Sequence, residues 1–151
     1  MLGFVGGTGA EGRGLALRLA AAGYPCLIGS REPDRGRDAA ALIAGMPASP
    51  RSTGLPLPYA GHPDTLSALG EHLEGKIVVD VTAPVRPPRV DVYAPPEGGS
   101  AASEAAAILG PGSTVVAAFQ NVAAGKLEQL GEPVDCDVLV CGDDEAGKER
   151  V

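Results

Sequence analysis

Apolar residues are distributed along the chain in two patterns. Some form short continuous runs, and others recur three or four positions apart in longer stretches. The short runs predict buried strands, which lie at Met1–Gly6, Pro25–Gly29, Lys76–Val81, Ser113–Phe119 and Asp137–Cys141. The longer stretches predict helices, which lie at Gly12–Ala22, Asp34–Gly45, Pro63–Leu73, Ser100–Leu109 and Ala123–Leu130, with a sixth beginning at Gly142-Asp143-Asp144-Glu145.

The first half of the chain follows the order strand, helix, strand, helix, which is typical of a parallel sheet with right-handed crossovers. Gly23 is placed to end the first helix and Ser100 to cap a later one. Met46–Pro58 holds four prolines and predicts no strand, and the Pro- and Gly-rich Thr82–Gly99 predicts a long loop. The fold class is therefore α/β, and 151 residues have room for a single domain over 1–151.

Composition narrows the class of protein. Apolar residues make up 44% of the chain and aromatic residues 3%, without Trp, so Val, Leu, Ile and Ala must build the core. The net charge of −7 disfavours nucleic acid or an anionic membrane surface as the main partner. No stretch has the length of a transmembrane helix and the N-terminus lacks signal-peptide features, so we expect a cytoplasmic protein. Cys26, Cys136 and Cys141 lie in strand-like segments, which predicts reduced, buried thiols.

Metal chemistry finds little support in the sequence. His62 and His72 are the only histidines, and neither stands among Cys or carboxylate residues at metal-ligand spacing. We therefore expect surface or loop histidines and no metal site. The acidic run Asp143-Asp144-Glu145 could suggest a Mg²⁺ site, but capping a helix and complementing its dipole is the simpler explanation.

A glycine-rich segment directly follows the first strand and opens the first helix. Gly7-Thr8-Gly9-Ala10-Glu11-Gly12 matches the pattern G-x-G-x-x-G, in which the first glycine permits a tight turn and the second lets a pyrophosphate approach the backbone. The third glycine lets the helix pack closely on the strand. Free N–H groups and the positive end of the helix dipole would hold the phosphates. The segment predicts a dinucleotide site in a Rossmann-type, doubly wound, mostly parallel sheet with helices on both faces.

The end of the second strand indicates which dinucleotide binds. NAD-binding domains place Asp or Glu there for the ribose hydroxyls, whereas this chain has Ser30 and Arg31, with Arg35 one helical turn later. A guanidinium can form paired charge-assisted hydrogen bonds to a 2′-phosphate, worth about 1.5–3 kcal/mol each. The sequence thus predicts NADP(H) rather than NAD, although Glu32 stands close enough to reach the ribose and the arginines could also be solvated.

These residues resemble the NADPH-dependent reductases of the deazaflavin coenzyme F-420. The similarity is most specific in the N-terminal third and also covers scattered later segments, namely Gly6-Gly7-Thr8-Gly9, Gly14–Ala20, Gly29-Ser30-Arg31, Pro58-Tyr59, Lys76–Val79 and Val140–Asp144. The resemblance implies hydride transfer between stacked nicotinamide and deazaflavin rings, with no side chain obliged to act as acid or base. It also implies a homodimer.

The same resemblance places the site residues. Thr8, Ser30, Arg31 and Arg35 would contact the phosphates of NADP, and Pro58-Tyr59 would lie in a loop near the nicotinamide. Thr82-Ala83-Pro84-Val85 follows a strand at the end where ligands bind in open α/β sheets. A second-substrate cleft would be lined by Ala83, Pro84, Gln120 and Val122.

The chain departs from the family at three places. Thr53-Gly54-Leu55-Pro56-Leu57 runs straight into Pro58-Tyr59, as if a segment were missing, and the C-terminal part of the family is absent after Val151. Gln120 stands where a family member has histidine. Other interpretations stay open: a reductase of another small substrate, a non-catalytic NADP(H)-sensing module, or a fragment that only binds the cofactor.

Overall fold

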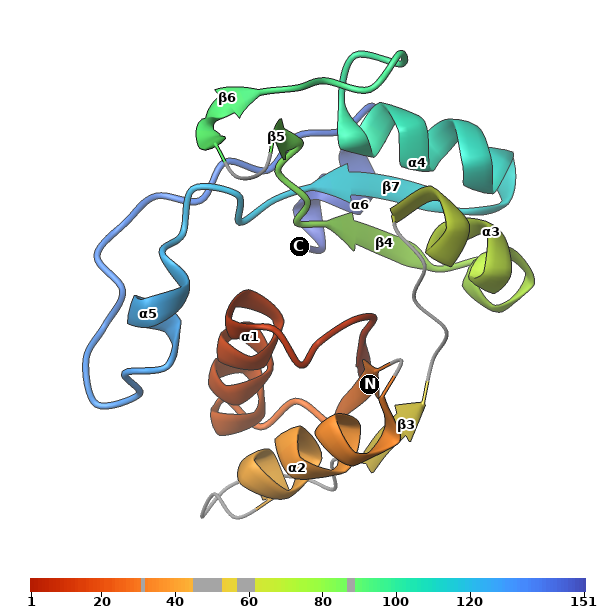
Figure 1. Ribbon diagram of the computed structural model, residues 1–151. Helices are drawn as coiled ribbons and strands as arrows, with labels where there is room; N and C mark the ends of the chain where they lie inside the picture. Colours follow the sequence, from red (N-terminus) through yellow and green to blue (C-terminus); the bar gives the residue numbers. More distant parts are fainter. Residues whose placement is uncertain (31, 45–52, 57–61, 87–88) are drawn as a thin grey trace. The chain divides into compact units, whose positions relative to one another are not determined.

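The computed structural model describes residues 1–30, 32–44, 53–56, 62–86 and 89–151 (Figure 1). These residues form two compact units. The first contains Met1–Tyr59 and Val122–Cys136, and the second contains Ala60–Asn121 and Asp137–Val151. Arg31, Pro58 and Tyr59 were predicted to bind the cofactor and lie outside the described residues.

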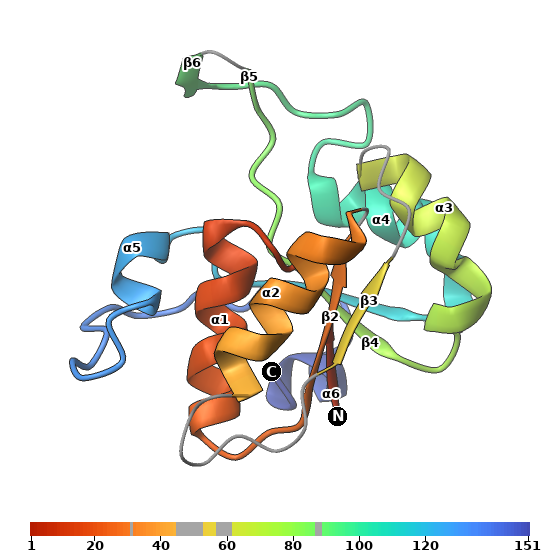
Figure 2. The same ribbon diagram turned by 60° about the horizontal axis from the view of Figure 1, so that its bottom comes forward.

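The first unit is built on a three-stranded parallel sheet in the order β1-β2-β3. Its strands are β1 (Leu2–Phe4), β2 (Cys26–Ser30) and β3 (Thr53–Pro56), with Leu2 opposite Cys26 and Leu27 opposite Thr53. Helices α1 (Ala10–Ala21) and α2 (Pro33–Ala44) lie against this sheet (Figure 2). The pairing is parallel because each crossover helix returns the chain to the end of the sheet at which the previous strand began.

The core of the first unit is made of small and branched residues. Ile28 of β2 and Ile43 of α2 are fully buried. Alanines of both helices complete the core, and their small side chains let the helices approach the sheet closely. The core members are Ala16, Leu17, Ala20, Cys26, Ile28, Ala39 and Ile43.

A short helix from late in the sequence packs on α1. It is α5 (Ala124–Leu127), and a Cβ placed on Gly14 would lie 2.5 Å from the Cβ of Leu127. The guanidinium of Arg18 lies within hydrogen-bonding distance of four carbonyl oxygens in and after α5, those of Lys126, Leu127, Gln129 and Glu132, at 2.7–2.9 Å. Arg18 therefore attaches the segment around α5 to the first helix.

The second unit contains a separate pair of parallel strands, β4 (Ile77–Asp80) and β7 (Thr114–Ala117). Helices α3 (His62–Leu73) and α4 (Ala101–Leu109) pack against each other, and α4 also contacts β7 (Figure 1). A 3₁₀ turn, Gly110–Gly112, links α4 to β7. An antiparallel pair, β5 (Val85–Arg86) and β6 (Arg89–Tyr93), and the short helix α6 (Glu145–Glu149) complete the unit.

The α/β class and the parallel strands are confirmed, as are several local signals. Gly23 has φ +94° after α1, and the Ser100 hydroxyl accepts a hydrogen bond from the N–H of Ser103 at the start of α4. Asp144 caps α6 in the same way, through the N–H of Gly147. The helix expected over Ala123–Leu130 is shorter, since α5 has four residues.

Three local predictions are wrong. Thr53–Pro56, inside the proline-rich segment, forms β3 because its backbone pairs with β2 at the end of the strand order β1-β2-β3, and an edge strand tolerates proline. The loop Thr82–Gly99 contains the β5–β6 pair. Asp137–Cys141 is not a strand: only Cys141 pairs, antiparallel, with Ala117, and both Cys136 and Cys141 are exposed free thiols. Cys26 is buried as expected.

None of the helices in the described part of the chain has both the length and the apolar character needed to span a bilayer.

Candidate functional site

The glycine-rich loop connects β1 to α1 and leaves the start of the helix open. Gly6 adopts φ +67°, and the N–H of Gly7 donates to the carbonyl of Gly29 at 3.1 Å, which ties the loop to β2. Gly9 is the N-cap of α1 and has no side chain to cap it. The N–H groups of the first turn therefore have no acceptor within the helix, and they are donors for an external anion.

The space around each position explains why the loop has glycine at 7 and 12. A Cβ on Gly7 would lie 2.7 Å from the Cβ of Phe4, and one on Gly12 would lie 2.8 Å from the Cα of Gly7. Gly9, in contrast, has nothing within 4 Å of its Cβ position. The left-handed turn thus falls on Gly6 rather than on Gly7 as predicted, while Gly12 allows close packing and Gly9 leaves the backbone open to approach.

Glu11 introduces a carboxyl group into this loop. Its Oε1 atom is buried and finds no hydrogen-bond partner among the described residues. Loss of solvation raises the pKa of the Glu11 carboxyl above its ordinary value of 4.5. Ala10, the neighbouring predicted residue, is exposed at the first position of α1.

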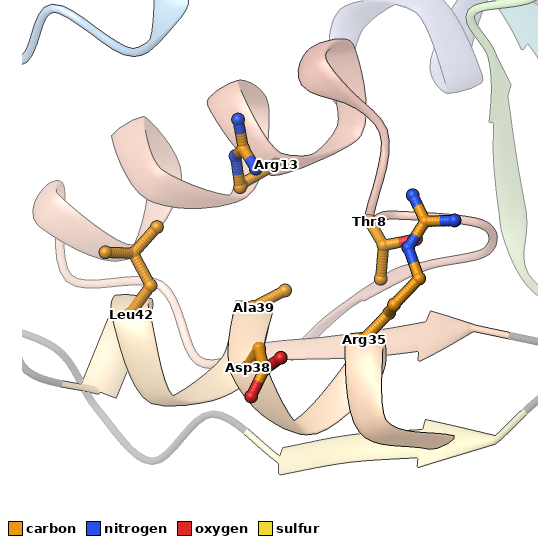
Figure 3. A pocket seen from close by; sticks show the side chains of 6 residues that line it. All are labelled: Thr8, Arg13, Arg35, Asp38, Ala39 and Leu42. Carbon is orange, nitrogen blue, oxygen red and sulfur yellow. The ribbon is translucent and has the colours of Figure 1, made fainter. Parts of the chain in front are cut away.

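A pocket of about 380 Å³ lies between the glycine-rich loop, α1 and α2. Two predicted residues, Thr8 and Arg35, meet in it, and Figure 3 shows the guanidinium of Arg35 directed towards Thr8. The remaining lining residues are Arg13, Asp38, Ala39 and Leu42, none of which the sequence analysis identified. Arg13 is held by an ion pair with Glu128, in which its Nε donates at 2.8 Å.

The residues at the end of β2 surround the start of α2. Ser30 is 3% exposed, and its hydroxyl oxygen accepts from the N–H of Glu32 at 3.2 Å. Glu32 is exposed and pairs with Arg35, with 3.4 Å between Oε1 and Nη1. Glu32 thus lies beside the predicted phosphate ligand and partly neutralises its charge.

The second unit holds a pocket of its own, of about 490 Å³. Three residues predicted for the second substrate line it: Ala83, Pro84 and Gln120. The side-chain amide of Gln120 is fixed by donating to the carbonyl of Asp80 at 2.8 Å. The fourth, Val122, does not line this pocket; it is 7% exposed and belongs to the first unit. Val122 therefore stays a predicted contact that this pocket does not include.

The sequence analysis missed a polar cluster in the second unit. His62, expected as an isolated surface or loop residue, begins α3 and contacts Asp80 and Glu104. No local pattern connects these three residues, because 18 and 42 positions separate the histidine from its partners. Within the ranges that the structure describes, no group of three or more His, Cys, Asp or Glu has the arrangement of a metal site.

Comparison with known proteins assigns the chain to a family. An F420-dependent NADP reductase of Methanocaldococcus jannaschii is 39% identical over 171 aligned positions, which cover 97% of this chain and 74% of that protein. A protein of the same name from Methanothermobacter thermautotrophicus is 35% identical, covering 92% of this chain and 68% of its own length. The chain belongs to the F420-dependent NADP reductase family. This confirms the resemblance found in the sequence.

The chain was also compared with family models and with solved structures. No family model matches the chain. Among solved structures, a hypothetical protein of Sinorhizobium meliloti superposes with a TM-score of 0.67 at 22% identity, over 99% of this chain and 75% of that one, which supports the fold. The alignment to the M. jannaschii reductase spans 171 positions against 151 residues here, so that member of the family carries residues with no counterpart in this chain.

Proposed function

We propose that the protein is an NADP-dependent oxidoreductase that transfers hydride between NADPH and the deazaflavin coenzyme F420. The observation that carries this proposal is the identity of 33–39% to three F420-dependent NADP reductases over at least 92% of the chain. The local geometry of the first unit fits the nucleotide at the glycine-rich loop and in the pocket beside it.

The glycine-rich loop fits a pyrophosphate. The N-cap of α1 has no capping side chain, and open space surrounds Gly9, so an anion can reach the free N–H groups of the first turn. The positive end of the helix dipole adds to the attraction. We therefore assign Gly7, Thr8, Gly9, Ala10, Glu11 and Gly12 to the phosphate-binding loop.

The pocket beside this loop fits a 2′-phosphate. Arg35 supplies a guanidinium and Thr8 a hydroxyl at one end of the pocket, and Ser30 lies at the end of the adjoining strand. The guanidinium of Arg35 attracts a 2′-phosphate, and its pairing with Glu32 offsets part of this charge. Arg31 lies outside the described residues and stays a predicted contact. A charge-assisted pair of this kind is worth about 1.5–3 kcal/mol, or about 10- to 150-fold in affinity.

The pocket of the second unit is our candidate for the other coenzyme. Ala83 and Pro84 give it apolar surface, and Gln120 gives it an amide. Hydride passes directly between the two coenzymes when both are bound, so this chain's residues need only bind, orient and exclude water. We accordingly assign no catalytic acid or base, and we keep Pro58, Tyr59 and Val122 as proposed contacts on the nicotinamide side.

Three wider features belong to the same proposal. We propose one NADP-binding domain over 1–151, a homodimer, and a cytoplasmic location, where both small-molecule coenzymes would be partners. The family resemblance supports the dimer, and the use of diffusible coenzymes supports the location.

The test is the absorbance of oxidised coenzyme F420 mixed with the protein and NADPH, with NADH in a parallel cuvette. We expect rapid bleaching with NADPH and little with NADH. Equal bleaching by both would refute the assignment of the 2′-phosphate pocket. A folded sample that binds NADPH without bleaching the coenzyme would refute the proposed reaction and favour another substrate or a sensing role.

Substitutions in α2 test whether Arg35 binds the 2′-phosphate. Arg35→Ala should raise the KM for NADPH about 10-fold or more and leave the KM for NADH nearly unchanged. Arg37→Ala is the matched control, because Arg37 lies on the same helix, pairs with Asp34 and does not line the pocket. An equal loss in both variants would show that net charge, not the pocket, attracts NADPH.

A further inference from the structure

Three polar side chains from three elements of the second unit meet in one cluster, which we call the His62 cluster. His62 is the first residue of α3, Asp80 the last of β4, and Glu104 lies in the first turn of α4. Nε2 of His62 is 3.0 Å from Oδ2 of Asp80, and Nδ1 is 3.2 Å from Oε2 of Glu104. Exposure falls from 31% for Glu104 to 19% for His62 and 3% for Asp80.

The imidazole of His62 has a carboxyl group at each of its ring nitrogens. One oxygen of Asp80 faces Nε2 and one oxygen of Glu104 faces Nδ1, each within hydrogen-bonding distance. The ring of His62 therefore connects α3, β4 and α4 at one point.

The buried end of the cluster leads directly to the pocket of the second unit. The second oxygen of Asp80, Oδ1, accepts from the N–H of Thr82 at 2.7 Å. The main-chain carbonyl of Asp80 accepts a hydrogen bond from the side-chain amide of Gln120 at 2.8 Å. Thr82 and Gln120 both line the pocket, and Ala83 and Pro84 follow Thr82 along its wall.

The exposed end of the cluster approaches the same pocket from another side. Glu104 stands on the first turn of α4, and its N–H donates to the carbonyl of Ser100 at 3.0 Å. Ser100 and Ser103 also line the pocket. The cluster therefore joins two walls of the pocket, the segment after β4 and the start of α4, although neither His62 nor Asp80 lines the pocket itself.

We propose that His62 and Asp80 are positioning residues that hold the segment Thr82–Pro84 and Gln120 in the conformation that accepts the second substrate. This proposal rests on the proposed function, because it concerns the coenzyme that exchanges hydride with NADPH. His62 acts on Asp80, and Asp80 acts through its two oxygen contacts on Thr82 and Gln120. Neither residue takes part in hydride transfer.

The experiment compares His62→Gln with the wild type, and His72→Gln serves as the matched control because His72 is an exposed histidine near the other end of α3. Glutamine at 62 keeps a polar side chain but has no second ring nitrogen with which to contact Asp80 and Glu104 at once. We expect the KM for oxidised coenzyme F420, at saturating NADPH, to rise about 10-fold or more, since displaced positioning groups can cost up to about 100-fold. The Kd for NADPH should change less than about twofold, and His72→Gln should match the wild type in both.

A general loss of structure would give a different result. If His62 only stabilises the fold, thermal unfolding will shift while the KM for the deazaflavin coenzyme in the folded variant stays at the wild-type value, and the proposal is overturned. An equal rise in the Kd for NADPH would overturn it as well. Should His62→Gln fail to fold, Glu104→Gln, at the exposed end of the cluster, should show the same selective rise in KM to a smaller degree.

The two proposals fail in distinguishable ways. Turnover by the wild type together with an unchanged KM in the variants overturns the positioning role and leaves the reaction intact. Absence of turnover overturns the proposed reaction, and binding of the oxidised coenzyme, followed by its fluorescence, then tests positioning directly. A wild type that neither reduces nor binds the coenzyme overturns both.

Discussion

Replacing Arg18 by alanine would detach the segment around α5 from α1. The Nε–H of Arg18 points at the carbonyl of Leu127, and Nη2 lies within 2.7–2.9 Å of the carbonyls of Lys126, Gln129 and Glu132. Because Nη2 carries two hydrogens, at most three full hydrogen bonds form among these four contacts. In the variant all four carbonyls lose the guanidinium, while those of Lys126 and Gln129 keep main-chain hydrogen bonds from Gln129 and Glu132.

The loss in the free energy of unfolding follows from the number of hydrogen bonds that Arg18 makes. A hydrogen bond to a charged group contributes about 1.5–3 kcal/mol when buried, and the outer contacts of Arg18 are exposed, so about 1 kcal/mol for each of three is reasonable. The free energy of unfolding should fall by about 3 kcal/mol. For a chain of this size, about 2–4 °C per kcal/mol gives a decrease in Tm of about 6–12 °C.

Arg13 provides the control. It lies on the same helix and contacts the same segment, but its partner is the Glu128 carboxylate, and the two side chains are 37% and 34% exposed. Exposed pairs contribute about 0.2–1 kcal/mol, so Arg13→Ala should lower the Tm by at most about 4 °C. Differential scanning calorimetry without ligand measures the decrease in Tm of Arg18→Ala and of Arg13→Ala. Equal, small shifts would refute the argument that the carbonyl contacts of Arg18 attach α5.

Other substitutions test separate parts of the structure. Gly12→Ala should destabilise the protein by about 1–3 kcal/mol in urea unfolding and weaken NADPH binding, since its Cβ meets the backbone of Gly7 at 2.8 Å. Ser100→Ala should cost about 1 kcal/mol through loss of the N-cap of α4. The raised pKa of Glu11 means that the folded state holds this proton more tightly than the unfolded state, so wild-type stability is lost as pH rises through the shifted pKa. Glu11→Gln should therefore be more stable than the wild type at about pH 7, and this advantage should vanish at about pH 4 in paired urea titrations.

The features that the sequence predicted are those fixed by short-range sterics and local hydrogen bonds. The glycines of the loop, the left-handed Gly23 and the cap at Ser100 each depend on a few neighbouring residues. Helix α3 was placed within one residue for the same reason, because its apolar spacing is a local property. Arg35 was predicted from its place one helical turn after the second strand, and Thr8 from the family resemblance.

The features that the sequence did not predict depend on residues far away along the chain. β3 exists because residues 53–56 pair with β2, and a segment with several prolines gives no local sign of this. Cys141 was expected to be buried in a strand, but it pairs at a single bridge and stays exposed. The His62 cluster needs residues up to 42 positions away, so only the folded chain reveals it.

The partners of Arg18 stand 108–114 residues further along the chain. During synthesis, therefore, β1, β2 and both early helices leave the ribosome long before the segment that α1 must bind. At about 5–20 residues per second, this delay lasts for roughly 5–20 s. Over that interval the face of α1 around Gly14 is available to other apolar chains, so we expect the nascent protein to depend on chaperones until residue 132 has emerged.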